Sequence, residues 1–153
     1  MNQHAAPQPP PYYWRGALWL SPGDVIQPGN WGKVIFAFGV RHNLFFREYV
    51  YERIRSTEFA AQPSRMRAAF AFRDEAVARA FDQAAAPLLY RVQPVAGAHT
   101  ATLDMQWLDV GSGAHTFDEA EDFARRYWAC EQTLQPRWEI LSELGFTVID
   151  RLA

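Results

Sequence analysis

Residues 137–151 read RWEILSELGFTVIDR, with apolar and polar positions alternating on both sides of a short connection. Residues 137–141 and 146–151 are therefore predicted to be two strands joined through residues 142–145. Trp138 and Ile140 are expected to face the core. Glu139 then lies on the opposite, accessible face, where folding does not require a charge.

Further strands are predicted upstream, where apolar residues alternate or cluster between turn-forming residues. They span residues 12–20, 67–72, 88–93 and 102–109. Residues 33–39, KVIFAFG, are interpreted either as a strand or as the start of an apolar loop. The chain thus has enough strand segments to build a sheet.

Helical spacing of apolar residues predicts three helices, at residues 44–57, 74–86 and 117–128. The third follows Thr116, which with Glu119 has the spacing of a capping box. Residues 111–113, Gly-Ser-Gly, are interpreted as a flexible loop. Several strands mixed with three helices predict an α+β fold.

The composition is that of one folded domain. The chain has 153 residues, of which 49% are hydrophobic and 21% charged, a balance that disfavours intrinsic disorder. Residues 1–11 contain four prolines and are expected to form an extended lead-in to a domain at residues 12–153. The formal charge of −2 predicts no general attraction to nucleic acid or membrane.

A cytoplasmic location without a membrane partner is expected. Cys130 is the single cysteine, so the chain cannot close an intrachain disulfide. The first residues lack the basic and then apolar layout of a secretory signal, and no run of 18 apolar residues occurs.

Common catalytic signatures are missing from the sequence. It has no phosphate-binding GxxxxGK[ST], no GxGxxG, no HExxH, no CxxC and no GxSxG. The four histidines are scattered without ligand spacing, so no metal is expected. Aromatic residues reach 15%, which fits either a ring-rich core or a pocket that stacks planar ligands.

Charges within predicted strands are the unusual feature. Arg15 lies in YYWRGALWL and Glu139 lies in RWEIL. Each is interpreted either as an edge-strand charge that opposes aggregation or as part of a site. Residues 41–73 also hold seven arginines against three glutamates, which fits a solvated helix face, or attraction of NAD phosphates or a nucleic-acid backbone.

Short motifs carry a resemblance to the ADP-ribosyltransferase superfamily, in particular to its small bacterial members. They are Trp14-Arg15-Gly16, Pro63-Ser64-Arg65, and Glu139-Ile140-Leu141 followed by Phe146-Thr147-Val148. The likeness spans residues 12–152. It implies an α+β domain with split mixed or antiparallel sheets and three flanking helices.

The resemblance also implies roles for single residues. NAD is the donor substrate, Arg15 and Gly16 hold the dinucleotide, and Ser64 and Arg65 lie on its nicotinamide side. Glu139 is catalytic, supported by Arg15. Breaking the nicotinamide–ribose bond builds positive charge on the ribose, and a carboxylate stabilises that charge.

Two departures from the family pattern bear on the acceptor. Arg137 stands where many protein-modifying members have glutamine or glutamate, and a single serine precedes RAAFAF. Arginine or glutamine targets are therefore not favoured. Residues 89–104 also resemble rifamycin-modifying transferases, which makes Asp104 a second carboxylate candidate. The aromatic residues considered for stacking on nicotinamide or adenine are Phe70, Tyr90 and Trp31.

We therefore expect a mono-ADP-ribosyltransferase whose acceptor is a protein, a nucleic acid or a small molecule. NAD hydrolysis is one alternative. A catalytically silent module that binds a nucleotide or a partner protein is another. An active transferase in the cytoplasm would endanger its host, so a toxin or defence role with a neutralising antitoxin or immunity partner is also expected.

Overall fold

The computed structural model describes residues 9–153 and confirms the predicted α+β class. Most of the expected proline-rich lead-in, residues 1–8, lies outside the described residues. No described helix combines the length and apolarity that a bilayer crossing requires.

Seven strands form one antiparallel sheet in the order β2-β7-β4-β1-β3-β6-β5. Their bounds are Tyr12–Gly16 (β1), Val25–Ile26 (β2), Ala69–Phe72 (β3), Leu88–Pro94 (β4), Thr100–Asp104 (β5), Trp138–Ser142 (β6) and Phe146–Arg151 (β7). Both β1 and β6 have a partner on each side. Neither Arg15 nor Glu139 is therefore an edge-strand charge, which corrects that interpretation.

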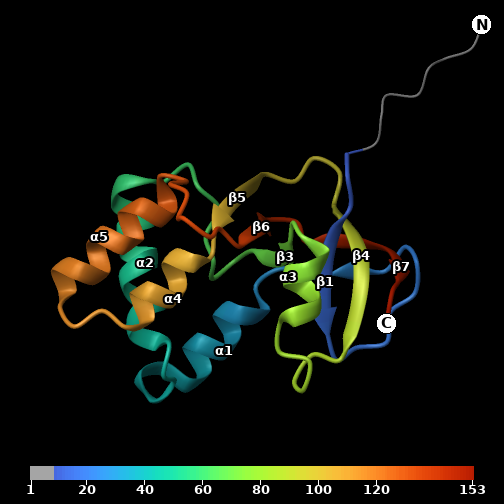
Figure 1. Cartoon of the computed structure of the whole chain (residues 1–153), viewed down its shortest axis with the longest axis horizontal. Coiled ribbons are helices and arrows are strands. Elements are labelled where there is room, and N and C mark those ends of the chain that lie inside the picture. Colours follow the sequence, from blue (N-terminus) through green and yellow to red (C-terminus); the bar gives the residue numbers. More distant parts are fainter. Residues whose placement is uncertain (1–8) are drawn as a thin grey trace, which may run out of the picture.

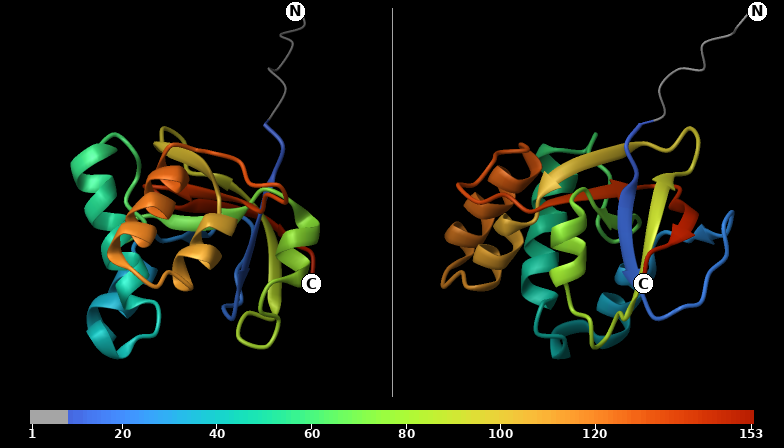
Figure 2. Two further views of the ribbon diagram at one scale, coloured as in Figure 1. Left: turned by 60° about the vertical axis from the view of Figure 1, so that its left-hand side comes forward. Right: turned by 45° about the vertical axis from the view of Figure 1, so that its right-hand side comes forward.

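The sheet is nearly divided into two halves. Strands β1 and β3 share a single residue pair, Tyr13 with Phe72, whereas β1 and β4 share five pairs and β3 and β6 share four. In Figure 1 and in the right view of Figure 2, β1 and β4 run vertically while β5 and β6 run across. The two halves therefore diverge on either side of the Tyr13–Phe72 joint.

Within residues 9–153, five α-helices and one 3-10 turn accompany the sheet, in place of the three predicted helices. Their bounds are Asn30–Phe38 (α1), Gly39–Arg41 (η1), Phe45–Glu58 (α2), Glu75–Ala80 (α3), Gln106–Ser112 (α4) and Phe117–Trp128 (α5). Helices α2, α4 and α5 group beside β3, β6 and β5, while α3 lies against β1 (Figure 1).

Each face of the central strands is covered by its own apolar cluster. Val50, Tyr127 and Trp128 from the helices pack with Leu103 and Leu141 from the sheet. The second cluster, on the other face, holds the residues that alternate with these, and it consists of Ala69, Ala71, Tyr90, Val92, Ile140, Phe146 and Val148. Strand β6 is therefore buried on both sides.

Several predicted elements are confirmed with small changes at their ends. Helix α2 and strands β4, β6 and β7 lie within two residues of the predicted bounds. Helix α5 begins as predicted, because the Thr116 hydroxyl accepts a hydrogen bond from the backbone N–H of Glu119 at 3.2 Å.

Other predicted elements were wrong. Residues 33–38 belong to α1, which presents Gly32 and Ile35 to the core, and Gly39 begins η1. The strand expected at 102–109 ends at Asp104, whose carboxylate accepts the Gln106 N–H as α4 begins. Residues 111 and 112 of the expected Gly-Ser-Gly loop end that helix, and α3 stops at Ala80 instead of residue 86.

A glycine fixes the β6–β7 turn. Gly145 has a φ of 86°, and a Cβ there would overlap the Ile26 carbonyl oxygen. Gly97 has a similar φ of 78° but open space around it.

We predict that Gly97→Ala lowers the free energy of unfolding by about 1 kcal/mol, because alanine is disfavoured in the left-handed backbone conformation. Gly145→Ala should lose about 1–3 kcal/mol more through overlap. Urea unfolding of both variants measures this, and equal losses would contradict the assigned contact.

Candidate functional site

A buried charged cluster joins the helices to the sheet around Arg65. Arg65 lies in the α2–β3 connection, Glu48 on α2, Tyr127 on α5 and Glu139 on β6. All four are buried. The Arg65 guanidinium donates to Glu139 Oε1 at 2.6 Å, to Glu48 Oε2 at 3.1 Å and to the Tyr127 hydroxyl at 2.9 Å.

The cluster is extended by a second arginine and by aromatic rings. Arg47 donates to Glu48 Oε1 at 2.6 Å. The Arg65 guanidinium lies over the rings of Phe70 and Tyr127, at 4.8 Å and 5.6 Å from their centroids. Such stacking suits a planar, weakly hydrated cation removed from water. Two arginines and two carboxylates thus share the cluster.

Charge pairing shifts the pKa values in opposite directions. Burial alone would raise the pKa of Glu48, but the charges of Arg65 and Arg47 outweigh it and hold that pKa below its ordinary value. Burial opposes the charged form of Arg65, yet Glu139 and Glu48 keep its pKa above the ordinary range. Burial raises the pKa of Tyr127 well above the ordinary range, so its hydroxyl stays protonated and can donate.

Glu139 is held through one carboxylate oxygen. The Tyr127 hydroxyl donates to Oε1 at 2.5 Å, the same oxygen that Arg65 contacts. Among residues 9–153, no donor meets Oε2. The solvent-sealed side-chain atoms without a partner in that range are Trp31 Nε1 and Arg47 Nε. Oε2 is therefore not sealed from solvent, although Glu139 is only 5% exposed.

The predicted accessible face of Glu139 is corrected by the sheet register. Leu103, Glu139 and Phe72 are paired across neighbouring strands, as are Phe72 and Tyr13. Paired residues share a face, so Glu139 points to the helix-covered side with Leu103. The predicted alternation of side chains in β6 was correct, but helices cover the face of the sheet that carries Glu139, which was expected to be accessible.

Arg15 is bound by backbone carbonyls and does not contact Glu139. Its guanidinium donates to the carbonyl oxygens of Ala78, Arg79, Ala86 and Pro87, at 2.8–3.3 Å. These contacts hold the α3–β4 connection against β1. Of the five N–H donors of a guanidinium, one is left for a ligand. A role for Arg15 in holding NAD remains a prediction.

Asp104 fixes the connection between α5 and β6. Its carboxylate accepts hydrogen bonds from the backbone and hydroxyl of Thr133 and from the backbone N–H groups of Arg137 and Gln106, at 2.7–3.0 Å. Burial would raise the pKa of Asp104, but these hydrogen bonds lower it below its ordinary value. The structure places Asp104 apart from the Arg65 cluster, with its acceptor sites filled.

The other predicted residues are dispersed. Ser64 donates to Glu52 Oε2 at 3.0 Å. Tyr90 lies on the opposite face of the sheet from Glu139, where its hydroxyl bonds the backbone of residues 18 and 20. Trp31 on α1 packs edge-on against His42 at 5.3 Å. Gly16 ends β1, paired with Leu88. Phe70 alone joins Arg65 and Glu139 in one place.

Several arginines of the basic segment, residues 41–73, form ion pairs within the protein. Arg47 and Arg65 belong to the cluster, Arg55 pairs with Glu52, and Arg53 pairs with Glu121. Most of these cations neutralise carboxylates of the same chain. Arg41, Arg67 and Arg73 of the segment are exposed, and attraction of NAD phosphates or a nucleic-acid backbone stays a prediction.

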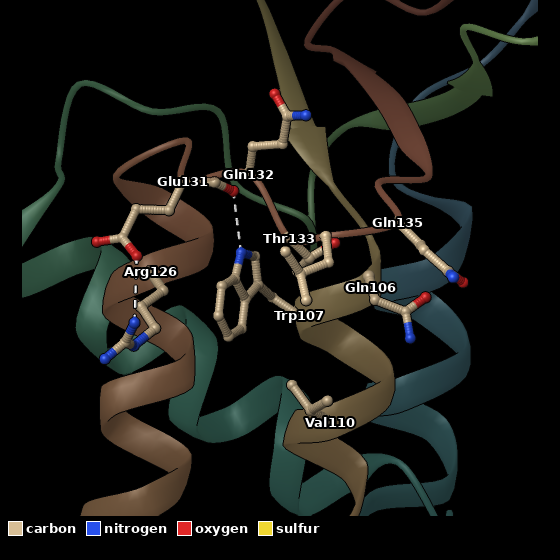
Figure 3. Close-up of a pocket in the computed structure, with 9 residues that line it drawn as sticks. Gln106, Trp107, Val110, Arg126, Glu131, Gln132, Thr133 and Gln135 are labelled. Carbon is tan, nitrogen blue, oxygen red and sulfur yellow. Dashed lines mark hydrogen bonds and ion pairs between the residues drawn. The ribbon is translucent and has the colours of Figure 1, made fainter.

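A separate surface hollow of about 690 Å³ lies between α4, the end of α5 and the α5–β6 connection (Figure 3). No predicted site residue lines it. The Trp107 ring is stacked with Phe123 at 6.2 Å and faces the Arg126 guanidinium at 5.5 Å, and its Nε1 donates to the Glu131 carbonyl. Internal contacts thus occupy its main aromatic ring. No group of His, Cys, Asp or Glu suited to a metal ion occurs in the described part of the chain.

Comparison with known protein families assigns the chain to one of them. The chain belongs to the family described as protein of unknown function (DUF2441), whose sequence model matches residues 30–153. The matched region contains Glu48, Arg65, Tyr127 and Glu139 but begins after Arg15. A search of curated proteins found no match.

Sequence reasoning missed Arg47, Glu48 and Tyr127 as members of the Arg65 cluster. A signal was present, because residues 47 and 48 precede the buried Tyr51 by four and three positions, on neighbouring turns of one helix face.

The first prediction from this site concerns Arg65. Arg65→Met would leave Glu139 without its cation and Glu48 with Arg47 alone. We predict that the free energy of unfolding falls by about 3–5 kcal/mol, the effect of breaking a buried ion pair. Arg79→Met, which removes an exposed pair with Glu75, is the control and should change it little. Urea unfolding tests both, and a small loss for Arg65→Met would contradict the buried pairing.

The second prediction concerns pH. The lowered pKa of Glu48 means that its ion pairs stabilise the fold fully above its ordinary value of 4.5 and are lost as pH falls through the folded-state pKa. Glu48→Gln should destabilise the protein at neutral pH. The free energy of unfolding of this variant should then fall less than that of the wild type between about pH 5 and about pH 3. Parallel pH profiles of wild type and variant would contradict this role.

Proposed function

We propose that this protein is an NAD-dependent mono-ADP-ribosyltransferase in which Glu139 acts at the ribose. The observation that carries the proposal is the Glu139 carboxylate. One oxygen is fixed by Arg65 and Tyr127, and the other has no protein donor and is not sealed from solvent. A carboxylate held rigidly through one oxygen, with the other free of protein donors, suits stabilisation of developing positive charge.

The proposed step breaks the bond between nicotinamide nitrogen and ribose C1′. Nicotinamide leaves with the bonding electron pair, and the acceptor forms the new bond to C1′ and loses a proton to solvent. Glu139 Oε2 is the group that stabilises the cationic ribose and orients its hydroxyls. Arg65 and Tyr127 position Glu139, because both hold its other oxygen.

Neighbouring aromatic rings support a planar ligand at this place. Phe72 pairs with Glu139 across the strands, and Phe70 lies two residues earlier on the same face. Both rings are half-buried, and Arg65 covers a face of Phe70. Phe70 therefore remains the aromatic residue that we propose for contact with the nicotinamide side.

A catalytically silent module that binds a nucleotide or a partner protein is the second candidate. The occupied guanidinium of Arg15 favours it, because the dinucleotide loses its predicted main anchor. Incubation with NAD, with and without a cell lysate, separates the candidates. Nicotinamide release only with lysate indicates a transferase, release without lysate indicates hydrolysis, and no release indicates the silent module.

The variant that tests the assignment is Glu139→Gln. We predict a loss of nicotinamide release of about two to three orders of magnitude, because the amide cannot balance the ribose charge. Circular dichroism at the assay temperature checks that the variant is folded. Glu143→Gln, at the exposed turn after β6, is the matched control and should keep the full rate. A folded Glu139→Gln variant with wild-type release would remove Glu139 from the chemistry.

A further inference from the structure

An exposed apolar tip connects α1 to α2. Phe36, Phe38 and Val40 have exposed fractions of 75%, 54% and 84%. The connection lies at the lower extremity of the molecule in Figure 1 and in the left view of Figure 2. We call residues 36–42 the α1–α2 tip. Neighbouring apolar side chains that project together into water mark a surface for binding.

The exposure of the tip is fixed by the local backbone. Gly39 ends α1 with φ 53° and ψ −138°, a conformation that glycine adopts readily, and its N–H donates to the Ile35 carbonyl. His42 then packs edge-on against Phe38 at 6.1 Å and against Trp31 at 5.3 Å. The tip is therefore a folded projection and not a frayed end.

The apolar surface continues beside the tip. A hollow of about 380 Å³ lies between the tip and the start of α2, with Val40, Phe46, Tyr49 and Phe117 among its lining residues. Phe46 and Phe117 contact each other edge-on at 5.1 Å, and both are exposed. The patch thus extends across the start of α2 and of α5.

Residues 25–42, the tip and the segment before it, contain basic residues and no Asp or Glu, although the whole chain has a formal charge of −2. Lys33 and Arg41 are the charged residues there, whereas Arg47, which follows, is buried and paired with Glu48. Lys33 and Arg41 are exposed. Exposed aromatic side chains accompanied by basic residues complement a surface that is anionic outside and apolar beneath.

We propose that the α1–α2 tip binds the surface of an anionic phospholipid bilayer. Phe36, Phe38 and Val40 enter the boundary between headgroups and acyl chains, while Lys33 and Arg41 contact lipid phosphates. A projecting tip can enter this layer while the sheet and the Arg65 cluster stay outside. The proposal replaces the expectation of no membrane partner, and it is independent of the proposed NAD chemistry.

The test is sedimentation of the full chain with vesicles. Vesicles of phosphatidylcholine mixed with phosphatidylserine should carry the protein down, and added salt should release it. Vesicles of phosphatidylcholine alone should bind at least tenfold more weakly. Wild-type protein that stays in the supernatant with anionic vesicles would overturn the proposal.

Two variants and a control locate the binding surface. Phe36→Ser combined with Phe38→Ser should lower the vesicle partition coefficient at least tenfold, as should Lys33→Gln combined with Arg41→Gln. Leu134→Ser, at a fully exposed leucine of the α5–β6 connection, should bind like wild type. Unchanged binding by the phenylalanine variant would overturn the proposal. So would a wild-type dimer in sedimentation analysis that this variant disperses without any vesicle binding, because the tip would then join two copies.

Discussion

Arg65 is a cation almost sealed from water, and two carboxylates from different parts of the chain balance its charge. Glu48 reaches it from α2 and Glu139 from β6, while Tyr127 from α5 donates to the same oxygen of Glu139. Removing any of these groups leaves a buried charge or donor without its full set of partners. The packing of α2 and α5 on the sheet therefore depends on this cluster as well as on apolar contacts.

The same cluster determines what Glu139 can do. The Arg65 guanidinium donates to Glu139 Oε1 at 2.6 Å, and the Tyr127 hydroxyl donates to the same oxygen at 2.5 Å. Because both contacts fall on Oε1, the carboxylate keeps a fixed orientation with Oε2 open. The nearly divided sheet also determines the neighbours of Glu139. Strands β3 and β6 carry Phe70, Phe72 and Glu139 on one face, beside the Tyr13–Phe72 joint.

Local patterns predicted those elements whose signals were strong. The capping box at Thr116 and the alternation in β4, β6 and β7 were read correctly. The orientation of Glu139 was not, because β6 is buried on both faces and a period of two does not show which side carries the helices. The helix at residues 33–38 was not predicted for a related reason, since a short apolar run does not distinguish strand from helix.

The site was predicted in part. The structure brings Glu139, Arg65 and Phe70 together, whereas Arg15, Ser64, Asp104, Tyr90 and Trp31 have separate contacts. The roles of all these residues toward NAD stay predictions. Sequence spacing does not show which distant groups a charged side chain will bind. The hydrogen bonds from Arg15 to four backbone carbonyls could therefore not be predicted, nor could those that fill the acceptor sites of Asp104. Glu48 and Tyr127 were missed because α2 and α5 have ordinary amphipathic patterns. Such a pattern does not show that a glutamate is buried or that a tyrosine hydroxyl reaches a carboxylate.

A double-mutant cycle between Arg65→Met and Glu139→Gln tests most directly whether one buried cation positions the Glu139 carboxylate. The free energy of unfolding is measured by urea unfolding for wild type, both single variants and the double variant. The two substitutions are expected to be coupled by about 2 kcal/mol or more, with the double variant less destabilised than the sum of the singles. Additive effects, within about 0.5 kcal/mol, would show that Arg65 and Glu139 act independently and would contradict the account.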